Sequence, residues 1–274
     1  MPELPEVETI KRSLEPQIVG CRITQITAST SRLRWTLSES DRTAVVTQQI
    51  VSLVRRAKYL VFSLSQGDLV AHLGMSGYLA LQATPLVKPH VHLSLYLDCN
   101  QVLSYCDPRR FGGWQWVPGG VHNTPMFEQL GPEPLSDQLD VEQLLQRMSR
   151  SQQAIKIWLM NQANLVGVGN IYANEALFAT KIHPETPASM LSRAVVVQLI
   201  KNLQIILLQA IETGGTSLKD FQSTDGQLGY FSQKLQVYNR EGLPCYHCHS
   251  KIVRWQLGQR STFACMTCQN ERSC

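Results

Sequence analysis

The chain has 274 residues, 43% of them hydrophobic and 17% charged, which is ordinary for one large or two modest globular domains. The formal net charge of +4 gives only weak support for a polyanionic partner. The N-terminus is acidic without an apolar run, which argues against a signal peptide, and the apolar stretch 194–211 is broken by polar residues, which predicts an amphipathic helix and not a membrane span. We therefore expect a cytoplasmic protein with no membrane partner.

The first 117 residues predict one helix followed by strands. Apolar residues at 4, 7, 10 and 14 have helical spacing, and Pro5 suits a first helical turn. From about residue 18 the pattern changes to short runs rich in Val, Ile, Leu, Thr and Tyr, separated by turn residues. The clearest runs are 44–54, 59–64, 69–73, 79–82, 92–97 and 102–106. This pattern predicts an antiparallel β-rich domain with the first helix packed on it.

The second half of the chain is predicted to be mainly helical. Residues 118–134 are rich in Gly, Pro and Asn, which is typical of a linker. Helical patterns follow over 141–148, 151–161, 171–179 and 189–212. Residues 213–234 are glycine-rich and predict a loop, and 235–268 predict a small β-hairpin unit that carries cysteines.

Four of the eight cysteines form a zinc-binding pattern, Cys245-x2-Cys248-x16-Cys265-x2-Cys268. Sixteen residues are enough for a hairpin that brings the two Cys-x-x-Cys pairs together. Four thiolates would close the coordination shell, so we expect a structural zinc ion. The alternative, a pair of disulfides, is disfavoured in a reducing cytoplasm. The other cysteines, Cys21, Cys99, Cys106 and Cys274, show no spacing pattern.

The N-terminus offers a nucleophile beside two acids. Pro2 is small enough for the initiator methionine to be removed, which would expose a secondary amine with a pKa of roughly 8. Such an amine forms an iminium at an anomeric carbon, which is a good electron sink for β-elimination. Glu3 and Glu6 are in reach for proton transfer. The alternative is structural, because acids at a helix start complement the helix dipole.

Three further segments are candidates for DNA contact. The turn 165–170 precedes a helix; its Gly167 and Gly169 would let a phosphate approach the backbone, and Asn170 is predicted to be the N-cap. A dinucleotide-binding motif is rejected there, because Tyr172 takes the place of the third glycine and no strand precedes it. Segments 72–77 and 107–112 resemble loops that leave strands. Met75 and Phe111 in them could fill a vacated base stack beside arginine, although each on its own is more often buried.

Together these segments resemble the bacterial formamidopyrimidine-DNA glycosylases of the helix-two-turn-helix superfamily. The resemblance rests on 1–9, 55–59, 72–77, 107–112, 165–172, 214–221, 229–231 and the four cysteines with Arg260. It implies an α+β fold with an N-terminal two-layered β-sandwich and flanking helices at 2–130. A helix-two-turn-helix bundle with a lesion-recognition loop would follow at 131–234, and a β-hairpin zinc finger at 235–268.

The resemblance also implies an activity: a bifunctional glycosylase and lyase that removes oxidised purines and cleaves the abasic strand by β,δ-elimination. The chain would act as a monomer on double-stranded DNA with oxidised purines or abasic sites, with one structural zinc ion and no catalytic metal or organic cofactor. The implied catalytic residues are Pro2, Glu3, Glu6, Lys58 and Arg260. The implied DNA-binding residues are Met75, His90, His92, Arg109, Phe111, Lys156, Asn170 and Tyr238. The implied base-recognition residues are Glu175, Thr216, Ser217, Lys219 and Tyr230.

Two alternative functions remain at this point. One is the sister family, endonuclease VIII, which removes oxidised pyrimidines with the same proline chemistry; Leu4 and the loop at 217–231 favour the purine enzyme. The other is a catalytically inactive zinc protein that only binds DNA lesions or abasic sites. The presence of Pro2, Glu3 and Lys58 argues against it.

Overall fold

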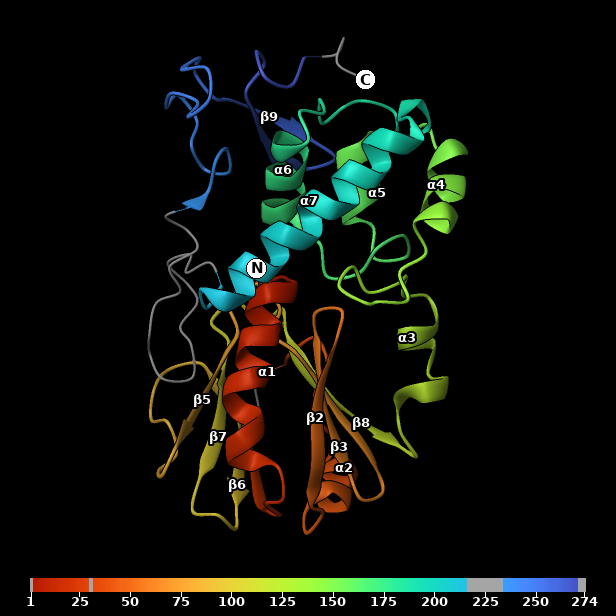
Figure 1. The fold of residues 1–274 in the computed structure, drawn as a ribbon. Helices are drawn as coiled ribbons and strands as arrows, with labels where there is room; N and C mark the ends of the chain where they lie inside the picture. The colour runs from red at the N-terminus through yellow and green to blue at the C-terminus, as the bar shows by residue number, and fades with distance from the viewer. Residues whose placement is uncertain (1, 30–31, 216–233, 271–274) are drawn as a thin grey trace. The chain divides into compact units, whose positions relative to one another are not determined.

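The computed structural model describes residues 2–29, 32–215 and 234–270 (Figure 1). These residues form two compact units: residues 2–128 with 211–215, and residues 129–210 with 234–270. The cysteine-bearing hairpin lies in the same unit as the helices, so a separate zinc-finger domain at 235–268 stays a prediction.

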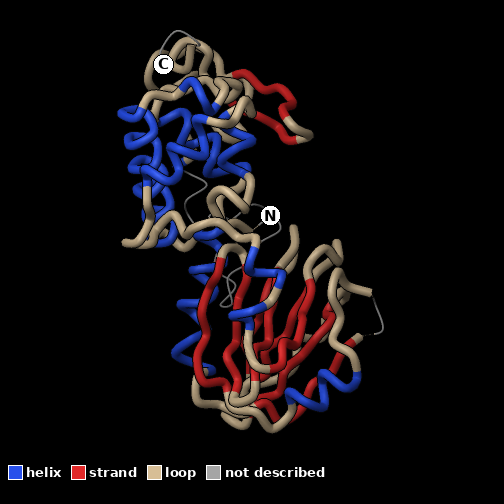
Figure 2. Tube along the Cα trace, turned by 90° about the vertical axis from the view of Figure 1, so that its right-hand side faces the viewer, coloured by secondary structure: helices blue, strands red, loops and turns tan. Residues whose placement is uncertain are grey.

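The first unit is built on two four-stranded antiparallel sheets (Figure 2). One sheet has the order β1 (Ile23–Ala28), β6 (Val91–Leu97), β7 (Val102–Cys106) and β5 (Tyr78–Gln82). The other has the order β2 (Ile50–Arg56), β3 (Tyr59–Leu64), β4 (Gly67–His72) and β8 (Gly113–Pro118). One hydrophobic core takes side chains from both sheets, which confirms the predicted β-sandwich.

Helix α1 (Leu4–Ile18) lies along the sandwich and closes its core (Figure 1). Its apolar stripe, Val7, Ile10, Leu14 and Ile18, is fully buried among strand residues. The spacing of three and four residues puts all four side chains on one face; the sequence predicts the first three, and Ile18 extends the stripe by one turn. This packing fixes the helix, and with it the position of its N-terminus.

The predicted strand at 44–54 is partly wrong. Residues Glu39–Val45 form helix α2, and β2 begins only at Ile50. Ser38 caps this helix: its Oγ accepts from the Asp41 backbone N–H, and Asp41 Oδ2 accepts from the Ser38 backbone N–H. This capping box is a helix-start signal that outweighs the β-branched residues following it.

Cys21 and Cys99 form a disulfide in the first unit, with Cα atoms 5.8 Å apart, although their spacing shows no pattern. Cys21 precedes β1, and Cys99 lies in the turn between β6 and β7. The two segments lie side by side because β1 pairs with β6. Next to the disulfide, the Arg22 backbone N–H donates to Asp98 Oδ1 at 2.8 Å. The pairing is a product of sheet register, which cysteine spacing does not report.

Short helices follow β8: η1 (Val121–Asn123) and α3 (Pro125–Glu128), within the segment expected as a linker. The second unit contains α4 (Val141–Ser149), α5 (Ile155–Met160), α6 (Asn170–Ala179), η2 (Ala188–Met190) and most of α7 (Arg193–Glu212). Its one described hairpin joins β9 (Val253–Leu257) to β10 (Arg260–Ala264). The helices and the hairpin confirm the predicted fold class.

Helix α7 is long and apolar enough to cross a membrane, by length and composition only. Core helices also pass this test. Val196, Leu199, Leu203 and Leu207 are fully buried, whereas polar residues such as Lys201 and Gln209 are exposed. The burial pattern is that of an amphipathic core helix, as predicted.

Candidate active site and nucleic-acid interface

Pro2, Glu3 and Glu6 come together at the N-terminus of α1. All three are buried, and the exposed fraction of each glutamate is 2%. Glu6 Oε2 accepts from the Glu3 backbone N–H at 2.9 Å, within a reciprocal capping box. The dipole of a fifteen-residue helix also favours negative charge at this end. The helix start therefore holds two buried carboxyl groups close after Pro2 in the chain, and their action on the Pro2 nitrogen stays a prediction.

Gly215 lies against Glu6 in the same unit. A Cβ added at Gly215 would lie 3.2 Å from Glu6 Cγ and 3.3 Å from Glu6 Oε1, and the residue has φ +80°, which disfavours L side chains. The positive φ favours glycine here, and any side chain would also press on Glu6. The segment predicted to recognise the damaged base begins directly after this contact.

A second connection ties α1 to the turn that carries Lys58. Arg55 Nε donates to Glu8 Oε2 at 2.9 Å, and Arg55 Nη1 donates to the Ala57 carbonyl at 3.1 Å. Burial tends to raise the pKa of Glu8, but the guanidinium groups of Arg55 and Arg12 outweigh it and hold the pKa below its usual range. Glu8 is thus a stable anion that fixes Arg55. Lys58 follows in the turn between β2 and β3, with an exposed fraction of 8%.

Met75, Arg109 and Phe111 meet at one open pocket of about 820 Å³ in the first unit. Phe111 is 49% exposed, and the Arg109 guanidinium lies 5.1 Å from the centre of its ring. The other lining residues are Arg32, Leu33, Arg34, His72, Gly74 and Arg110. An exposed aromatic ring among several arginines suits contact with unstacked bases and phosphates.

His72, at the end of β4, is a functional candidate that the sequence analysis did not single out. Its Nδ1 accepts from the Gly74 backbone N–H at 3.0 Å, so the ring is the neutral tautomer with the proton on Nε2. Burial, together with the nearby cations Arg34 and Lys58, lowers its pKa to about 4, although Asp107 opposes the shift. No sequence pattern marks this residue, because its state depends on neighbours from three other segments.

We expect the stability of the protein to fall as the pH drops from about 6.5 towards 4, because the unfolded His72 binds a proton that the folded ring refuses. The pKa of His72 is lower in the folded protein than in the unfolded chain. Its contribution to the free energy of unfolding is therefore complete above pH 6.5 and is lost as the pH falls from 6.5 to about 4. The loss from this ring is about 3 kcal/mol. NMR titration of the imidazole should give a pKa near 4, and His72→Asn should flatten the pH dependence of unfolding. The exposed His122 provides the control, His122→Asn. A His72 ring that titrates near 6.5 contradicts this assignment.

His90 and His92 are both bonded to the backbone of Asp107, two residues before Arg109. His90 is exposed, with φ 69°, and its carbonyl accepts from the Asp107 backbone N–H. His92 is 5% exposed; its Nδ1 lies 3.0 Å from Ser29 Oγ and its Nε2 lies 2.9 Å from the Asp107 carbonyl oxygen. Both ring nitrogens of His92 are thus engaged by protein. Direct DNA contact by either histidine stays a prediction.

In the second unit, α6 begins one residue earlier than predicted. Gly169 is the N-cap and Asn170 is the first helical residue, so the expectation of Asn170 as N-cap is wrong. The physical reason is that the Asn170 side chain has another partner: Nδ2 donates to the Ser261 carbonyl at 2.9 Å. The first residue of α6 is thereby joined to the β9–β10 hairpin.

Lys156 anchors the same hairpin from α5. Its side chain is fully buried, and Nζ donates to the Ser261 carbonyl at 2.8 Å and to Thr262 Oγ1 at 2.7 Å. Asn174 of α6 accepts from the Phe263 backbone N–H at 2.9 Å. These contacts hold the strand that starts at the exposed Arg260. They support a positioning role for Lys156, and its direct contact with DNA stays a prediction.

Glu175, also on α6, binds the chain just before the first cysteine pair. Its carboxylate accepts from the backbone N–H groups of Gln236, Val237 and Tyr238 at 2.8 to 3.0 Å. Burial raises its pKa, and these three bonds act against that shift. The Tyr238 ring packs 5.1 Å from Phe263. Of the other base-recognition candidates, Thr216, Ser217, Lys219 and Tyr230 lie outside the described residues.

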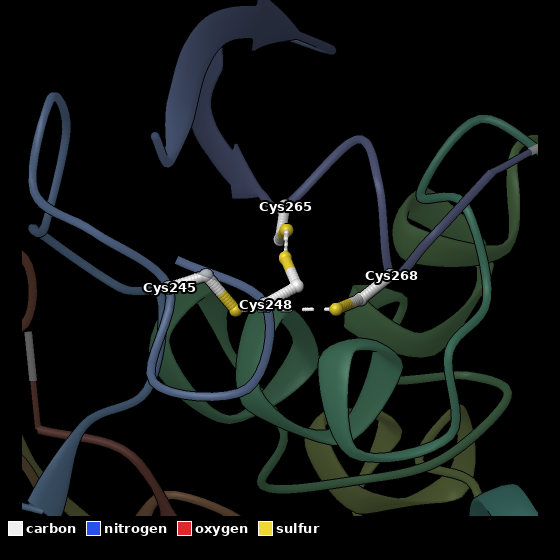
Figure 3. Close-up of side chains that lie close together, drawn as sticks. All are labelled: Cys245, Cys248, Cys265 and Cys268. Atoms are coloured by element: carbon white, nitrogen blue, oxygen red, sulfur yellow. Dashed lines mark hydrogen bonds between the residues drawn. The ribbon is translucent and has the colours of Figure 1, made fainter. Parts of the chain in front are cut away.

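The four predicted cysteine ligands converge from two segments onto one point (Figure 3). Their sulfur atoms all lie within 4.8 Å of one another; Cys248 and Cys265 are separated by 3.3 Å, and Cys245 and Cys268 by 3.9 Å. A tetrahedral ion with Zn–S bonds of 2.3 Å needs sulfurs about 3.8 Å apart. The donor set therefore fits a tetrahedral metal ion.

Comparison with known protein families gives two matches that together span most of the chain. The formamidopyrimidine-DNA glycosylase N-terminal domain matches residues 1–114, and the formamidopyrimidine-DNA glycosylase H2TH domain matches residues 130–222. Formamidopyrimidine-DNA glycosylases from Klebsiella pneumoniae and Escherichia coli are 46% and 47% identical to this chain over 270 residues, which is 98% of the chain and 100% of each relative.

Solved structures agree with the sequence relatives. The MutM (Fpg) protein of Thermus thermophilus has a TM-score of 0.88 and 37% identity, and covers 98% of this chain and 99% of its own. The Lactococcus lactis enzyme in complex with N7-benzyl-Fapy-dG DNA has a TM-score of 0.89 and 34% identity, and covers 98% and 100%. A further relative, with a TM-score of 0.88, 34% identity and the same coverage, is MutM bound to carbocyclic 8-oxo-G DNA. With both domains matched and near-complete coverage, this chain belongs to the formamidopyrimidine-DNA glycosylase family.

Proposed function

We propose that this protein is a base-excision repair enzyme that removes oxidised purines, 8-oxoguanine and formamidopyrimidines, and then cleaves the abasic strand. The observation that carries the proposal is the buried group of Pro2, Glu3 and Glu6 at the start of α1, in a chain whose N-terminal domain matches this family. Solved relatives bind Fapy-dG and 8-oxo-G DNA, which supports the same substrates here.

The chemistry begins at the Pro2 nitrogen once Met1 has been removed. The secondary amine attacks C1′ of the flipped nucleotide, the bond to the damaged base breaks, and an iminium forms. Glu3 donates a proton to the opening sugar ring, and Glu6 keeps Glu3 in place through its bond to the Glu3 backbone N–H. Loss of a C2′ proton expels the 3′ phosphate by β-elimination, and δ-elimination then expels the 5′ phosphate, which leaves a one-nucleotide gap with phosphate ends. Water finally hydrolyses the iminium between Pro2 and the sugar fragment and so frees the enzyme.

The phosphates around the damaged nucleotide are held by Lys58, Asn170 and Arg260, and the space left by the flipped base is filled by Met75, Arg109 and Phe111. The meeting of the last three at one pocket supports the second assignment. The anchoring of β10 by Lys156 and Asn170 supports the role of Arg260 at its first residue. The contact of Gly215 with Glu6 supports a base-recognition role for the segment that follows.

Arg260→Ala is expected to weaken DNA binding to a similar degree on damaged and undamaged duplexes, because a phosphate contact carries no sequence information. The slope of log K against log salt should become shallower by about one. Fluorescence anisotropy at several salt concentrations measures both effects. The exposed Arg150 at the end of α4 gives the control variant, Arg150→Ala. An unchanged slope in Arg260→Ala would remove this residue from the phosphate contacts.

One structural zinc ion would bind Cys245, Cys248, Cys265 and Cys268. Zinc is the ion of choice because its d¹⁰ shell imposes no geometry of its own and four thiolates satisfy it. The ion would supply structure and no catalytic chemistry, since the cysteines leave no open coordination position. We place the enzyme in the bacterial cytoplasm, where its DNA substrate lies.

Activity on two duplexes tests the proposed function against its alternatives. One duplex carries 8-oxoguanine opposite cytosine, and the other carries dihydrothymine. Faster excision of the purine lesion, with phosphate ends on both sides of the gap, is expected. Excision of dihydrothymine alone would make this a pyrimidine-directed enzyme. Binding to both duplexes without excision, in protein shown by mass to lack Met1, would favour a protein that only binds lesions.

A further inference from the structure

The carboxylate of Asp107 is the buried meeting point of the two loops that carry Met75, Arg109 and Phe111. Asp107 has no exposed surface. Oδ1 accepts from Ser76 Oγ at 2.7 Å and from the Arg109 backbone N–H at 3.2 Å. Oδ2 accepts from the Tyr105 hydroxyl at 3.0 Å and from the Gly112 backbone N–H at 2.9 Å. Four donors from both loops and from β7 thus converge on one side chain.

The backbone of Asp107 is fixed as firmly as its carboxylate. Its N–H donates to the His90 carbonyl at 2.9 Å, and its carbonyl oxygen lies 2.9 Å from His92 Nε2. His92 is itself held by Ser29, 3.0 Å from Nδ1. The residue cannot shift towards one loop without breaking bonds to the strands behind it.

Glycines bring the two loops into direct contact around this carboxylate. A Cβ at Gly74 would lie 2.3 Å from the Gly112 nitrogen, and Cβ atoms at Gly77 and Gly112 would lie 2.8 and 2.0 Å from the Tyr105 hydroxyl. No side chain fits at these three positions without moving backbone or a buried ring. The loops are therefore packed on each other and share one set of hydrogen bonds.

We propose that Asp107 is a positioning residue that locks the Met75 loop and the Arg109–Phe111 loop into one preassembled wedge before DNA arrives. The inference rests on the proposed function, in which these three side chains fill the space of the flipped base. A preassembled wedge does not pay the entropy of ordering two loops during insertion. Asp107 itself touches no DNA in this account and acts through Ser76, Arg109 and Gly112.

Asp107→Asn tests the proposal with little change of shape. The amide of asparagine has one acceptor oxygen, whereas the carboxylate has two. The two donors that face the new NH₂ group therefore lose their acceptor. Ser76→Ala is a milder second variant: it removes the donation to Asp107 Oδ1 and one of the two acceptors of the Arg109 backbone N–H, which keeps its bond to Asp107 Oδ1. Asp68→Asn is the matched control: Asp68 is also a buried carboxylate of the first unit, 6% exposed, and accepts from the Val121 backbone N–H at 2.8 Å, away from the wedge.

Amide hydrogen exchange reads the loops directly, without any activity. In Asp107→Asn, exchange over 73–77 and 107–112 should be about tenfold faster than in the wild type, and Ser76→Ala should fall between. Single-turnover excision of 8-oxoguanine from a duplex should also slow by about tenfold. Cleavage of an abasic site in single-stranded DNA should change by less than about twofold, because no stack has to be filled there. Asp68→Asn should leave all three within about twofold.

Unchanged exchange in both loops of Asp107→Asn would overturn the proposal. Equal losses on duplex and single-stranded DNA would also overturn it, because they indicate general damage to the unit. A wild-type protein that acts on neither DNA would refute the proposed function instead, and the exchange result would still decide whether Asp107 locks the loops.

Discussion

Pro2→Gly is expected to excise 8-oxoguanine at least about a hundredfold more slowly than the wild type while binding DNA with similar affinity. Proline supplies a secondary amine, whose iminium carries its charge without a further proton. It also fixes the chain directly before α1, where Pro2 is buried beside Glu3. Glycine gives a primary amine on a freely rotating backbone, so both the chemistry and its geometry suffer. Single-turnover excision and anisotropy titration measure the two effects separately.

Pro5→Ala is the matched control for this substitution. Pro5 is buried in the first turn of the same helix but contributes no amine. We expect this variant to keep excision within a few-fold of the wild type, since alanine is a good helix former. Excision by Pro2→Gly at the wild-type rate would show that the nucleophile lies elsewhere.

Cys265→Ser is expected to remove the metal and lower DNA affinity by at least about a hundredfold. A structural zinc ion supplies on the order of 10 kcal/mol of folding free energy in small modules. Without it, the small core around Val237, Ile252 and Phe263 loses its centre, since Cys245 and Cys265 are part of that core. The β9–β10 hairpin, with Arg260 at the start of β10, would then lose its fixed position. Metal analysis should find one zinc ion per wild-type chain and less than one in the variant.

Cys106→Ser separates loss of metal from loss of a buried thiol. Cys106 is a free, buried cysteine of β7 in the other unit, and its sulfur lies 3.5 Å from the Pro89 carbonyl oxygen, where a hydroxyl can also donate. This variant should keep its zinc and its DNA affinity. A full complement of zinc together with unchanged affinity in Cys265→Ser would contradict the assigned role of the cluster.

Local patterns in the sequence were sufficient for much of the fold. The spacing of Val7, Ile10 and Leu14 predicts the buried face of α1, and runs of β-branched residues predict most strands of the sandwich. Helix α2 was missed because it is short and ends in apolar residues that resemble the start of a strand. The capping box of Ser38 and Asp41, which marks the helix start, was overlooked. The disulfide between Cys21 and Cys99 was missed because it depends on the register of β1 against β6, which joins positions far apart in the chain.

The candidate site also contains some residues that the sequence predicts and others that it does not. The spacing of the four cysteines predicts a metal site from the sequence alone, and the structure brings their sulfur atoms together as predicted. His72 and Asp107 have no such signal, since their roles arise from burial and from partners on several strands. The family resemblance implied DNA binding by Lys156; the folded chain turns its ammonium group into the β9–β10 hairpin, and direct contact with DNA stays a prediction. The role of Pro2 came from family resemblance, because an N-terminal proline before a helix is otherwise a common structural feature.

Borohydride trapping on a duplex with one 8-oxoguanine opposite cytosine tests the central claim most directly. The protein used should be shown by mass to have lost Met1, and a dihydrothymine duplex should be treated in parallel. We expect a covalent protein–DNA product that is stronger on the purine lesion and absent in Pro2→Gly. No covalent product on either duplex, or an equally strong one in Pro2→Gly, would contradict the assignment of Pro2 as the Schiff-base nucleophile.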